Sequence, residues 1–282
     1  MKLVLKCLSL NLQNPNAPAN HIVLQMVRNK FGADHTVVAF QGVGRSDFEQ
    51  INDIFGDYYK ISEYPPVSTD ALLSSVILVS KSQPYDVLFD NYKFTESQAK
   101  YCGATFATLF DNKKKLIVLG SVQLDHVVHE RSPPRKYWFA QTTELGELLA
   151  NEPDCVLVGH FGFSDHQRSQ KDLFKTLQGD WRDPLAPNQR SSSKAHFTNS
   201  PNRRDDRVKI KGKDISVIAS RNHQECWNPE ARDRWERQYV ALLTQGRYTE
   251  AERIQKILDA LPTPFARRSP LSVEIMLRLK AK

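Results

Sequence analysis

Histidine and carboxylate side chains gather in two short stretches of the sequence, where their types suit a metal ion. Asp125 and His126 lie in the first stretch, and His160 and His166 lie in the second. Mixed imidazole and carboxylate ligands favour Zn²⁺ or Mn²⁺ over Mg²⁺. One interpretation is therefore a metal site built from Asp125, His160 and His166. The other is that His126 lies on a surface loop and His160 only fills space in the core.

A second group of side chains, arginines and one lysine, suits phosphate. Arginine binds phosphate through paired hydrogen bonds, and this binding requires no metal ion. The predicted nucleic-acid- or phosphate-binding residues are Arg203, Arg204, Arg207, Arg267, Arg268 and Lys114. The alternative is a solvated basic surface, because Asp205 and Asp206 neutralise part of the arginine cluster.

The composition fits a globular protein with a basic surface. The chain has 282 residues, of which 40 % are hydrophobic, and a net charge of +7 with a pI of about 9.2. On a chain of this length, such a charge is only weak support for a polyanionic partner. No run of about 18 apolar residues occurs, so no membrane span is expected. The four cysteines form no CxxC pair, which predicts reduced core thiols and an intracellular protein.

The apolar patterning predicts strands interspersed with helices. The predicted strands are 3–12, 36–40, 58–61, 75–80, 105–110, 116–124, 154–158, 208–210, 215–219 and 272–279. The predicted helices are 21–31, 47–55, 137–150 and 167–177, with loops at 131–136 and 180–202. Hairpins mix with crossover connections in this order. The pattern fits an α+β layered domain with two sheets packed face to face.

Seven short motifs mark the ends of these predicted strands. They are LSLNL, AFQGV, SVILVS, VQLDH, GHFG, DDRV and ARRSPL. In this order they resemble the motifs of the endonuclease/exonuclease/phosphatase superfamily, and the match runs through nearly the whole chain. The resemblance implies a four-layer αββα sandwich and Mg²⁺-dependent hydrolysis of phosphodiesters or phosphomonoesters. The stretch 172–208 is most similar to the 5′-tyrosyl-DNA phosphodiesterase branch.

The departures from the superfamily's motifs fall on its chemistry. The resemblance places Gly42 where the family has its metal-holding Glu, and Gln123 where a His stabilises the transition state. His160 and Gly162 stand in place of the Asp and Asn that orient water and phosphate, and Arg268 replaces the His of the final dyad. The family-site positions are therefore Asn11, Gly42, Gln123, His160, Gly162, Asp205 and Arg268.

These replacements predict a catalytically degenerate protein without a cofactor. Mg²⁺ prefers hard oxygen ligands and usually one or two carboxylates, whereas Gly42 offers none. Loss of a catalytic base alone typically costs a factor of about 10²–10⁴. We therefore expect a pseudoenzyme that binds nucleic acid or a protein partner within a larger assembly. The alternatives are an active metal-dependent phosphodiesterase or nuclease that uses Mg²⁺, Mn²⁺ or Zn²⁺ in a rebuilt site, and a purely structural subunit.

The segment 229–261 is predicted as a helical hairpin with a break at Gly246. The superfamily has only a short loop before its final motif, so the segment resembles an insertion into a single domain that spans 1–282. Large amphipathic side chains often anchor interfaces. The candidate partner-binding residues are Trp227, Trp235 and Tyr239. The alternative is that they pack the hairpin onto its own sandwich.

Overall fold

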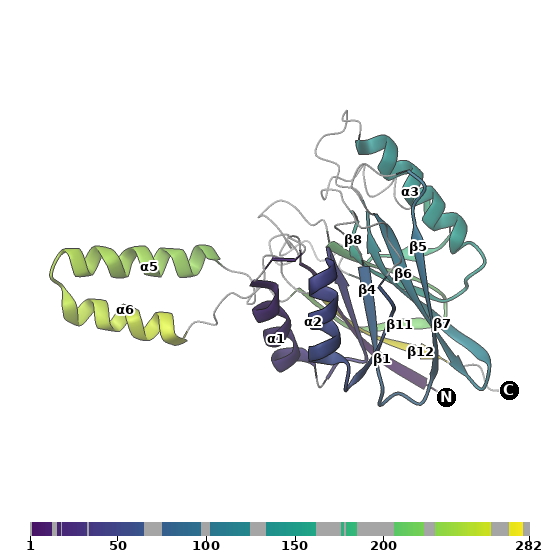
Figure 1. The fold of residues 1–282 in the computed structure, drawn as a ribbon, viewed down its shortest axis with the longest axis horizontal. Coiled ribbons are helices and arrows are strands. Elements are labelled where there is room, and N and C mark those ends of the chain that lie inside the picture. The colour runs from purple at the N-terminus through teal and green to yellow at the C-terminus, as the bar shows by residue number, and fades with distance from the viewer. Residues whose placement is uncertain are drawn as a thin grey trace.

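Two six-stranded sheets lie face to face, and helices cover their outer faces (Figure 1). The computed structural model describes residues 2–12, 16–17, 19–32, 34–64, 75–96, 102–124, 134–161, 176–177, 179–184, 206–222, 229–260 and 271–278. Among the helices in these ranges, none has the length and apolar character that a membrane crossing requires.

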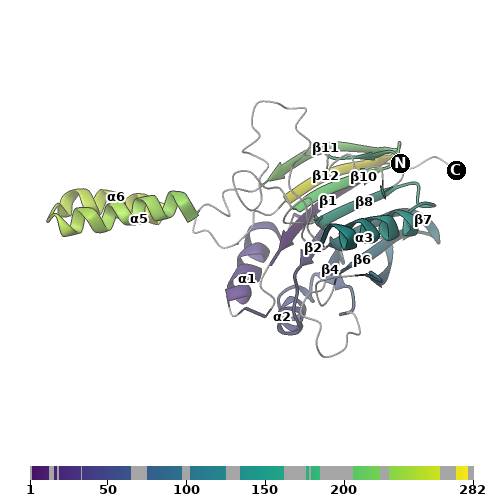
Figure 2. The same cartoon turned by 90° about the horizontal axis from the view of Figure 1, so that it is seen from above.

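The first sheet is built around a parallel pair of strands. In spatial order it contains β11 (Ile215–Asn222), β12 (Leu271–Arg278), β1 (Lys2–Asn11), β2 (Val37–Gln41), β4 (Ser75–Ser80) and β3 (Tyr59–Ile61). Only β1 and β2 are parallel, and α1 (Ala19–Phe31) connects them. This helix and α2 (Arg45–Phe55) cover the outer face, where Leu24 and Ile51 are buried against outward side chains of the sheet. The apolar face of each helix therefore forms one outer layer, visible in Figure 2.

The second sheet repeats this plan. In spatial order it contains β5 (Asp86–Lys93), β6 (Gly103–Asp111), β7 (Lys114–Gln123), β8 (Cys155–His160), β10 (Asp206–Lys211) and β9 (Trp181–Arg182). Strands β7 and β8 are parallel, and α3 (Pro134–Leu148) lies between them in the chain. Trp138 of α3 is buried on the outer face of the sheet, and its Nε1 donates a hydrogen bond to the Phe161 carbonyl at 2.7 Å. The helix is therefore held both by apolar packing and by this bond.

Side chains that alternate along each strand form the core between the sheets. On β1 the inward positions include Leu3, Leu5 and Cys7, whereas Leu8 and Leu10 face the helices. This period of two is the geometry of a strand buried on both faces. The predicted αββα arrangement is therefore confirmed.

Two strands and one helix boundary differ from the prediction. Strand β5 was not predicted, because it is an edge strand whose half-buried Val87 and Phe89 alternate with polar residues. Helix α3 begins at Pro134, inside the predicted loop, because a proline is tolerated in the first turn of a helix. The short strand β9 lies within the segment that was predicted as a loop from 180 to 202.

A pair of helices projects away from the sandwich in both views (Figures 1 and 2). The helices α5 (Pro229–Thr244) and α6 (Tyr248–Ala260) lie side by side. Leu242, Ala251 and Ile254 are buried against one another, and Tyr239 packs on them. The predicted helical hairpin and its break are thus present in the structure.

Candidate functional site

The space between the sheets is apolar along most of its length and becomes polar at one end. On β1 the inward series Leu3, Leu5 and Cys7 continues with Ser9 and Asn11. The same change occurs on β2, β4, β6, β7 and β8. We name these inward residues the polar end, and all of them are 7 % exposed or less: Ser9, Asn11, Gln41, Ser75, Thr105, Ser121, Gln123 and His160.

Strand register brings these residues to one edge of the sandwich. In the first sheet Asn11 pairs with Gln41. In the second sheet Gln123 pairs with His160, which also pairs with Asp206 of β10. Asn11, Gln41, Gln123 and His160 are the last residues of four strands that form two parallel pairs. The carboxyl ends of parallel strands are the usual place for a ligand site in α/β sheets.

Gln41 links the two sheets through its amide group. Its Nε2 donates a hydrogen bond to Ser121 Oγ at 2.9 Å across the sandwich, and Ser9 Oγ donates to its Oε1 at 3.2 Å. The Ser121 hydroxyl in turn lies 3.2 Å from the Phe40 carbonyl oxygen, which it can reach as a donor. Gln41 is completely buried. Its amide therefore holds the sheets together and is engaged on both its oxygen and its nitrogen.

A second polar link joins the sheets beside the first. The Thr105 hydroxyl lies 2.7 Å from the Ser75 carbonyl oxygen and 2.8 Å from Asn91 Oδ1, and it can donate to either. Ser75 Oγ also lies 3.0 Å from Thr105 Oγ1. Two hydrogen-bonded bridges thus cross the sandwich at the polar end, where apolar packing stops.

Glycine is required at two positions around Gln41. A Cβ atom on Gly159 would lie 2.2 Å from the Val122 carbonyl oxygen and 3.1 Å from Cδ of Gln41, so a side chain there would collide with both. Gly42 has φ +66°, in the left-handed region that favours glycine. A side chain at Gly159 would therefore push the strand ends apart, and a side chain at Gly42 would strain the backbone.

Gln123 carries a buried acceptor without a partner. The residue is only 7 % exposed, and its Oε1 is buried with no hydrogen-bond donor among the described residues. The Gln50 Oε1 and the Tyr64 hydroxyl oxygen share this property, but they belong to the layer outside the first sheet. Buried acceptors of this kind are rare, because each one costs roughly 1–3 kcal/mol of desolvation.

The arrangement of strands matches known structures, although no protein-family model and no curated protein matches the sequence. The chain is similar to a humanized D. rerio TDP2 with 14 mutations, at a TM-score of 0.66 and 12 % identity over 96 % of this chain and 98 % of that one. D. rerio TDP2 complexed with a single-strand DNA product gives 0.65 and 12 % over 96 % and 98 %. An endonuclease/exonuclease/phosphatase from Bacteroides vulgatus gives 0.65 and 12 % over 98 % and 100 %.

The fold is that of the endonuclease/exonuclease/phosphatase superfamily. The resemblance deduced from the strand-end motifs is thereby confirmed at the level of fold, and TDP2 structures are among those that share this fold. At 12 % identity the likeness extends to the fold alone.

The described residues at the polar end do not fit the Mg²⁺ that this superfamily's fold implies. The described side chains that line it are amides, hydroxyls and one imidazole, and Gly42 contributes no ligand. Within the described ranges no group of three His, Cys, Asp or Glu side chains lies close enough to hold a metal. Mg²⁺ prefers carboxylate and water oxygens in octahedral geometry. The rebuilt site of Asp125, His160 and His166 stays a prediction, because Asp125 and His166 lie outside the described residues.

Most of the predicted basic and aromatic residues also lie outside the described part of the chain. They are Arg203, Arg204, Arg267, Arg268 and Trp227, together with Gly162 and Asp205 of the family-site positions. Arg207 lies on β10 and Trp235 on α5, but the structure describes only their backbones. Tyr239 lies in the small apolar cluster of the projecting helices.

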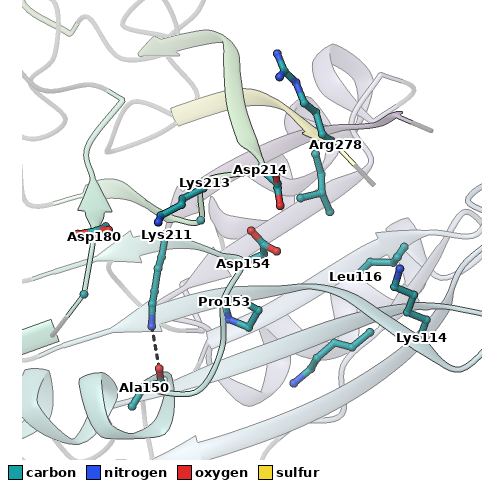
Figure 3. Close-up of a pocket in the computed structure, with 14 residues that line it drawn as sticks. Lys114, Leu116, Ala150, Pro153, Asp154, Asp180, Lys211, Lys213, Asp214 and Arg278 are labelled. Atoms are coloured by element: carbon teal, nitrogen blue, oxygen red, sulfur yellow. Dashed lines mark hydrogen bonds between the residues drawn. The ribbon is translucent and has the colours of Figure 1, made fainter. Parts of the chain in front are cut away.

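Lys114 is the predicted binding residue that the structure separates from the polar end. It begins β7, whereas Gln123 ends this strand, so the two are about 30 Å apart at about 3.3 Å per residue. Lys114 lines a groove of about 580 Å³ together with Lys213, Arg278 and Asp214 (Figure 3). The groove has mixed charge, and Lys211 Nζ is engaged there by the Ala150 carbonyl oxygen at 3.2 Å. The groove shares no residue with the polar end.

Proposed function

We propose that this chain is a catalytically degenerate member of the superfamily, which binds nucleic acid at the polar end of the sandwich and does not hydrolyse it. One observation supports this most strongly. The positions where the resemblance places the family's metal-holding Glu and its transition-state His carry Gly42 and Gln123 here, and the neighbouring Gln41 is hydrogen-bonded between Ser9 and Ser121. A group that holds the two sheets together is not available to a substrate.

The chemistry of phosphodiester hydrolysis explains why these neutral groups matter. The reaction needs positive charge near the phosphoryl oxygens and a group that accepts a proton from water. An amide such as that of Gln123 neither titrates nor carries charge. Among the described residues at family-site positions only His160 can accept a proton, and no carboxylate is among the polar-end side chains that the structure describes.

Nucleic acid is the ligand that the overall charge favours. The net charge is +7. Of the predicted phosphate-binding arginines, Arg203 and Arg204 precede β10, Arg207 lies on it, and Arg267 and Arg268 precede β12. A positive protein gains affinity for a polyanion by releasing counterions from its phosphates. In D. rerio TDP2, which has a similar fold, a single-strand DNA product has been seen bound.

Cleavage and binding measured in the same samples test this proposal. Labelled single-stranded RNA and DNA are incubated with the protein in Mg²⁺, Mn²⁺, Zn²⁺ or EDTA, and each sample is divided between a denaturing gel and a native gel. We expect a shift without cleavage that weakens at high salt and in Arg268→Glu. Metal-dependent cleavage that disappears in His160→Ala would overturn the proposal in favour of a rebuilt metal site.

A protein partner is the second candidate, and the projecting hairpin favours it. Among its described side chains, Leu242, Ala251 and Ile254 are buried against one another, whereas Val240 is 59 % and Tyr248 67 % exposed. Such a hairpin resembles an insertion carried by a single domain. Deletion of 229–260 is then expected to leave the sandwich folded and to abolish capture of the partner, while Arg267→Glu with Arg268→Glu has no effect. Loss of folding in the deletion would contradict the insertion.

A further inference from the structure

The unpartnered side-chain oxygen of Gln123 limits which chemical group of a bound nucleic acid can contact the polar end. Gln123 occupies an inward position of β7, two residues beyond Ser121, so its side chain belongs to the row that bridges the sheets. Its Oε1 is buried and accepts no hydrogen bond from the described residues. A ligand at this point therefore has to supply a donor.

Phosphate does not meet this requirement. At neutral pH the oxygens of a phosphodiester are acceptors only, so they repel the lone pairs of another acceptor. The neighbouring Gln41 amide is already occupied by Ser9 and Ser121 and offers no compensating charge. A phosphate placed against Gln123 Oε1 would leave both groups unsatisfied, at a cost of about 1–3 kcal/mol for the buried oxygen alone.

A metal cation is a poor partner for the Gln123 oxygen. A single amide oxygen is a weak ligand for Mg²⁺, which requires about six oxygens and favours carboxylates. The described residues provide no group of three acidic, histidine or cysteine side chains anywhere. The remaining donors are N–H and O–H groups, and the N–H groups of a nucleic acid are on its bases.

We propose that Gln123 Oε1 accepts a hydrogen bond from the edge of an unpaired nucleobase, so that the polar end holds a base and the phosphates lie outside it, an inference that rests on the proposed function. Unpaired bases in single strands are commonly read by hydrogen bonds on their Watson–Crick edges. Each of the four bases has an amino or imino donor on that edge. The contact therefore distinguishes a base-bearing strand from an abasic strand and does not select one base.

The test compares two labelled oligonucleotides of equal length by fluorescence anisotropy in EDTA. One carries bases, and the other carries abasic tetrahydrofuran units with the same number of phosphates. The variant Gln123→Met removes the acceptor while keeping a similar shape. The matched control is Gln50→Met, which removes the other buried glutamine oxygen without a partner, on the outer layer.

We expect Gln123→Met to bind the base-bearing strand about 5-fold more weakly, the typical effect of one neutral hydrogen bond, and to bind the abasic strand as the wild type does. Gln50→Met is expected to bind both strands like the wild type. Both variants are expected to have thermal unfolding midpoints at or above that of the wild type, because each loses an unsatisfied buried acceptor. A fall in midpoint for Gln123→Met would show that its oxygen is satisfied in the free protein and would overturn the inference.

Other outcomes contradict the inference in distinguishable ways. Equal loss on both strands, or no loss on either, would show that Gln123 does not contact a base, while nucleic-acid binding itself would stand. Binding that requires Mg²⁺ would make Gln123 Oε1 a cation ligand. A labelled glycine-serine peptide, which offers N–H donors without phosphate, serves as a third probe. Binding of this peptide alone, weakened in Gln123→Met, would replace nucleic acid by an extended peptide, and absence of any binding would remove the proposed function as well.

Discussion

The apolar and the polar parts of the interior are built on the same strands, and they stabilise the fold in different ways. Along β1 the inward side chains change from Leu5 and Cys7 to Ser9 and Asn11 within two positions. The apolar part is held by packing, which tolerates many side chains of similar volume. The polar end is held by two directional bridges, Gln41 to Ser121 and Thr105 to Ser75. The comparison teaches that the polar end itself holds the two sheets together, and that it contains one buried acceptor, Gln123 Oε1, without a partner among the described residues.

The largest expected effect is on the alkylation rate of Cys7, which lies where the apolar part meets the polar end. Burial raises the pKa of the Cys7 thiol from 9.0 to about 12. Because only the thiolate reacts, carboxymethylation of Cys7 at pH 8 is expected to be about 1000-fold slower in the folded protein than in the unfolded chain. Mass spectrometry of the Cys7 peptide measures this rate. Fast reaction without unfolding would show that water from the polar end reaches Cys7.

The same thiol gives a pH dependence with a definite sign. Because its pKa is higher in the folded state, the folded protein keeps this proton between pH 9 and about 12 while the unfolded chain loses it. The stabilisation is therefore complete below pH 9 and is lost as the pH rises towards 12. Cys7→Ala is expected to flatten this part of the stability profile. Buried Cys155, whose pKa is also raised to about 12, contributes in the same direction.

The next largest effect is expected for Gly159→Ala. The new Cβ would lie 2.2 Å from the Val122 carbonyl oxygen in a backbone with φ +134°. Overpacking and backbone strain together should lower the free energy of unfolding by about 3 kcal/mol or more, as measured by denaturant titration. Gly246→Ala is the matched control, because nothing lies within 4 Å of its Cβ position and only its φ of +70° is strained. A loss of about 1 kcal/mol is expected there.

A smaller loss in the free energy of unfolding is expected when the bridge from Gln41 to Ser121 is removed. Gln41→Ala breaks the hydrogen bonds to Ser9 and Ser121 and leaves a cavity, so the free energy of unfolding should fall by about 2 kcal/mol. Gln50→Ala, on the outer layer, removes an amide oxygen that has no partner and should cost less than about 0.5 kcal/mol. Equal losses in the two variants would show that the bridge does not hold the sheets together.

The smallest effect is expected on nucleic-acid affinity, when a residue of the groove that Lys114 lines is changed. Lys114→Glu should change nucleic-acid affinity by less than about 2-fold at physiological salt, because its charge lies several Debye lengths from the polar end. Arg207→Glu, which falls on β10 beside the Asp206 position, should weaken binding several-fold under the same conditions. The reverse ranking would place the bound strand in the groove of Figure 3.

Much of the fold could be predicted from local patterns. The series from Leu3 to Asn11 reads as a strand buried on both faces, and the turn at Gly159-His160 marks the end of another. Strand β5 could not be predicted in this way, because its half-buried apolar residues alternate with charged ones. The sequence order of the motifs predicted the fold of the superfamily, and the arrangement of strands then confirmed this fold.

The interactions within the candidate site were largely beyond the sequence. Family-site positions such as Gln123 and His160 could be placed by motif, but their partners could not. Gln41 reaches Ser121, which lies 80 residues away in the chain, and only the packing of the two sheets brings them together. The buried acceptor of Gln123 lacks a partner among the described residues because of three-dimensional packing, and the sequence pattern gives no signal of it.

The central claim is that this chain binds nucleic acid without hydrolysing it. The most direct test follows binding and metal-dependent cleavage together on one labelled single-stranded oligonucleotide. If the polar end is a retired catalytic site, the oligonucleotide will be bound in EDTA and will remain intact in Mg²⁺, Mn²⁺ and Zn²⁺ over hours. Cleavage that depends on one of these ions and on His160 would contradict the claim, because it would show that the site still hydrolyses phosphodiesters.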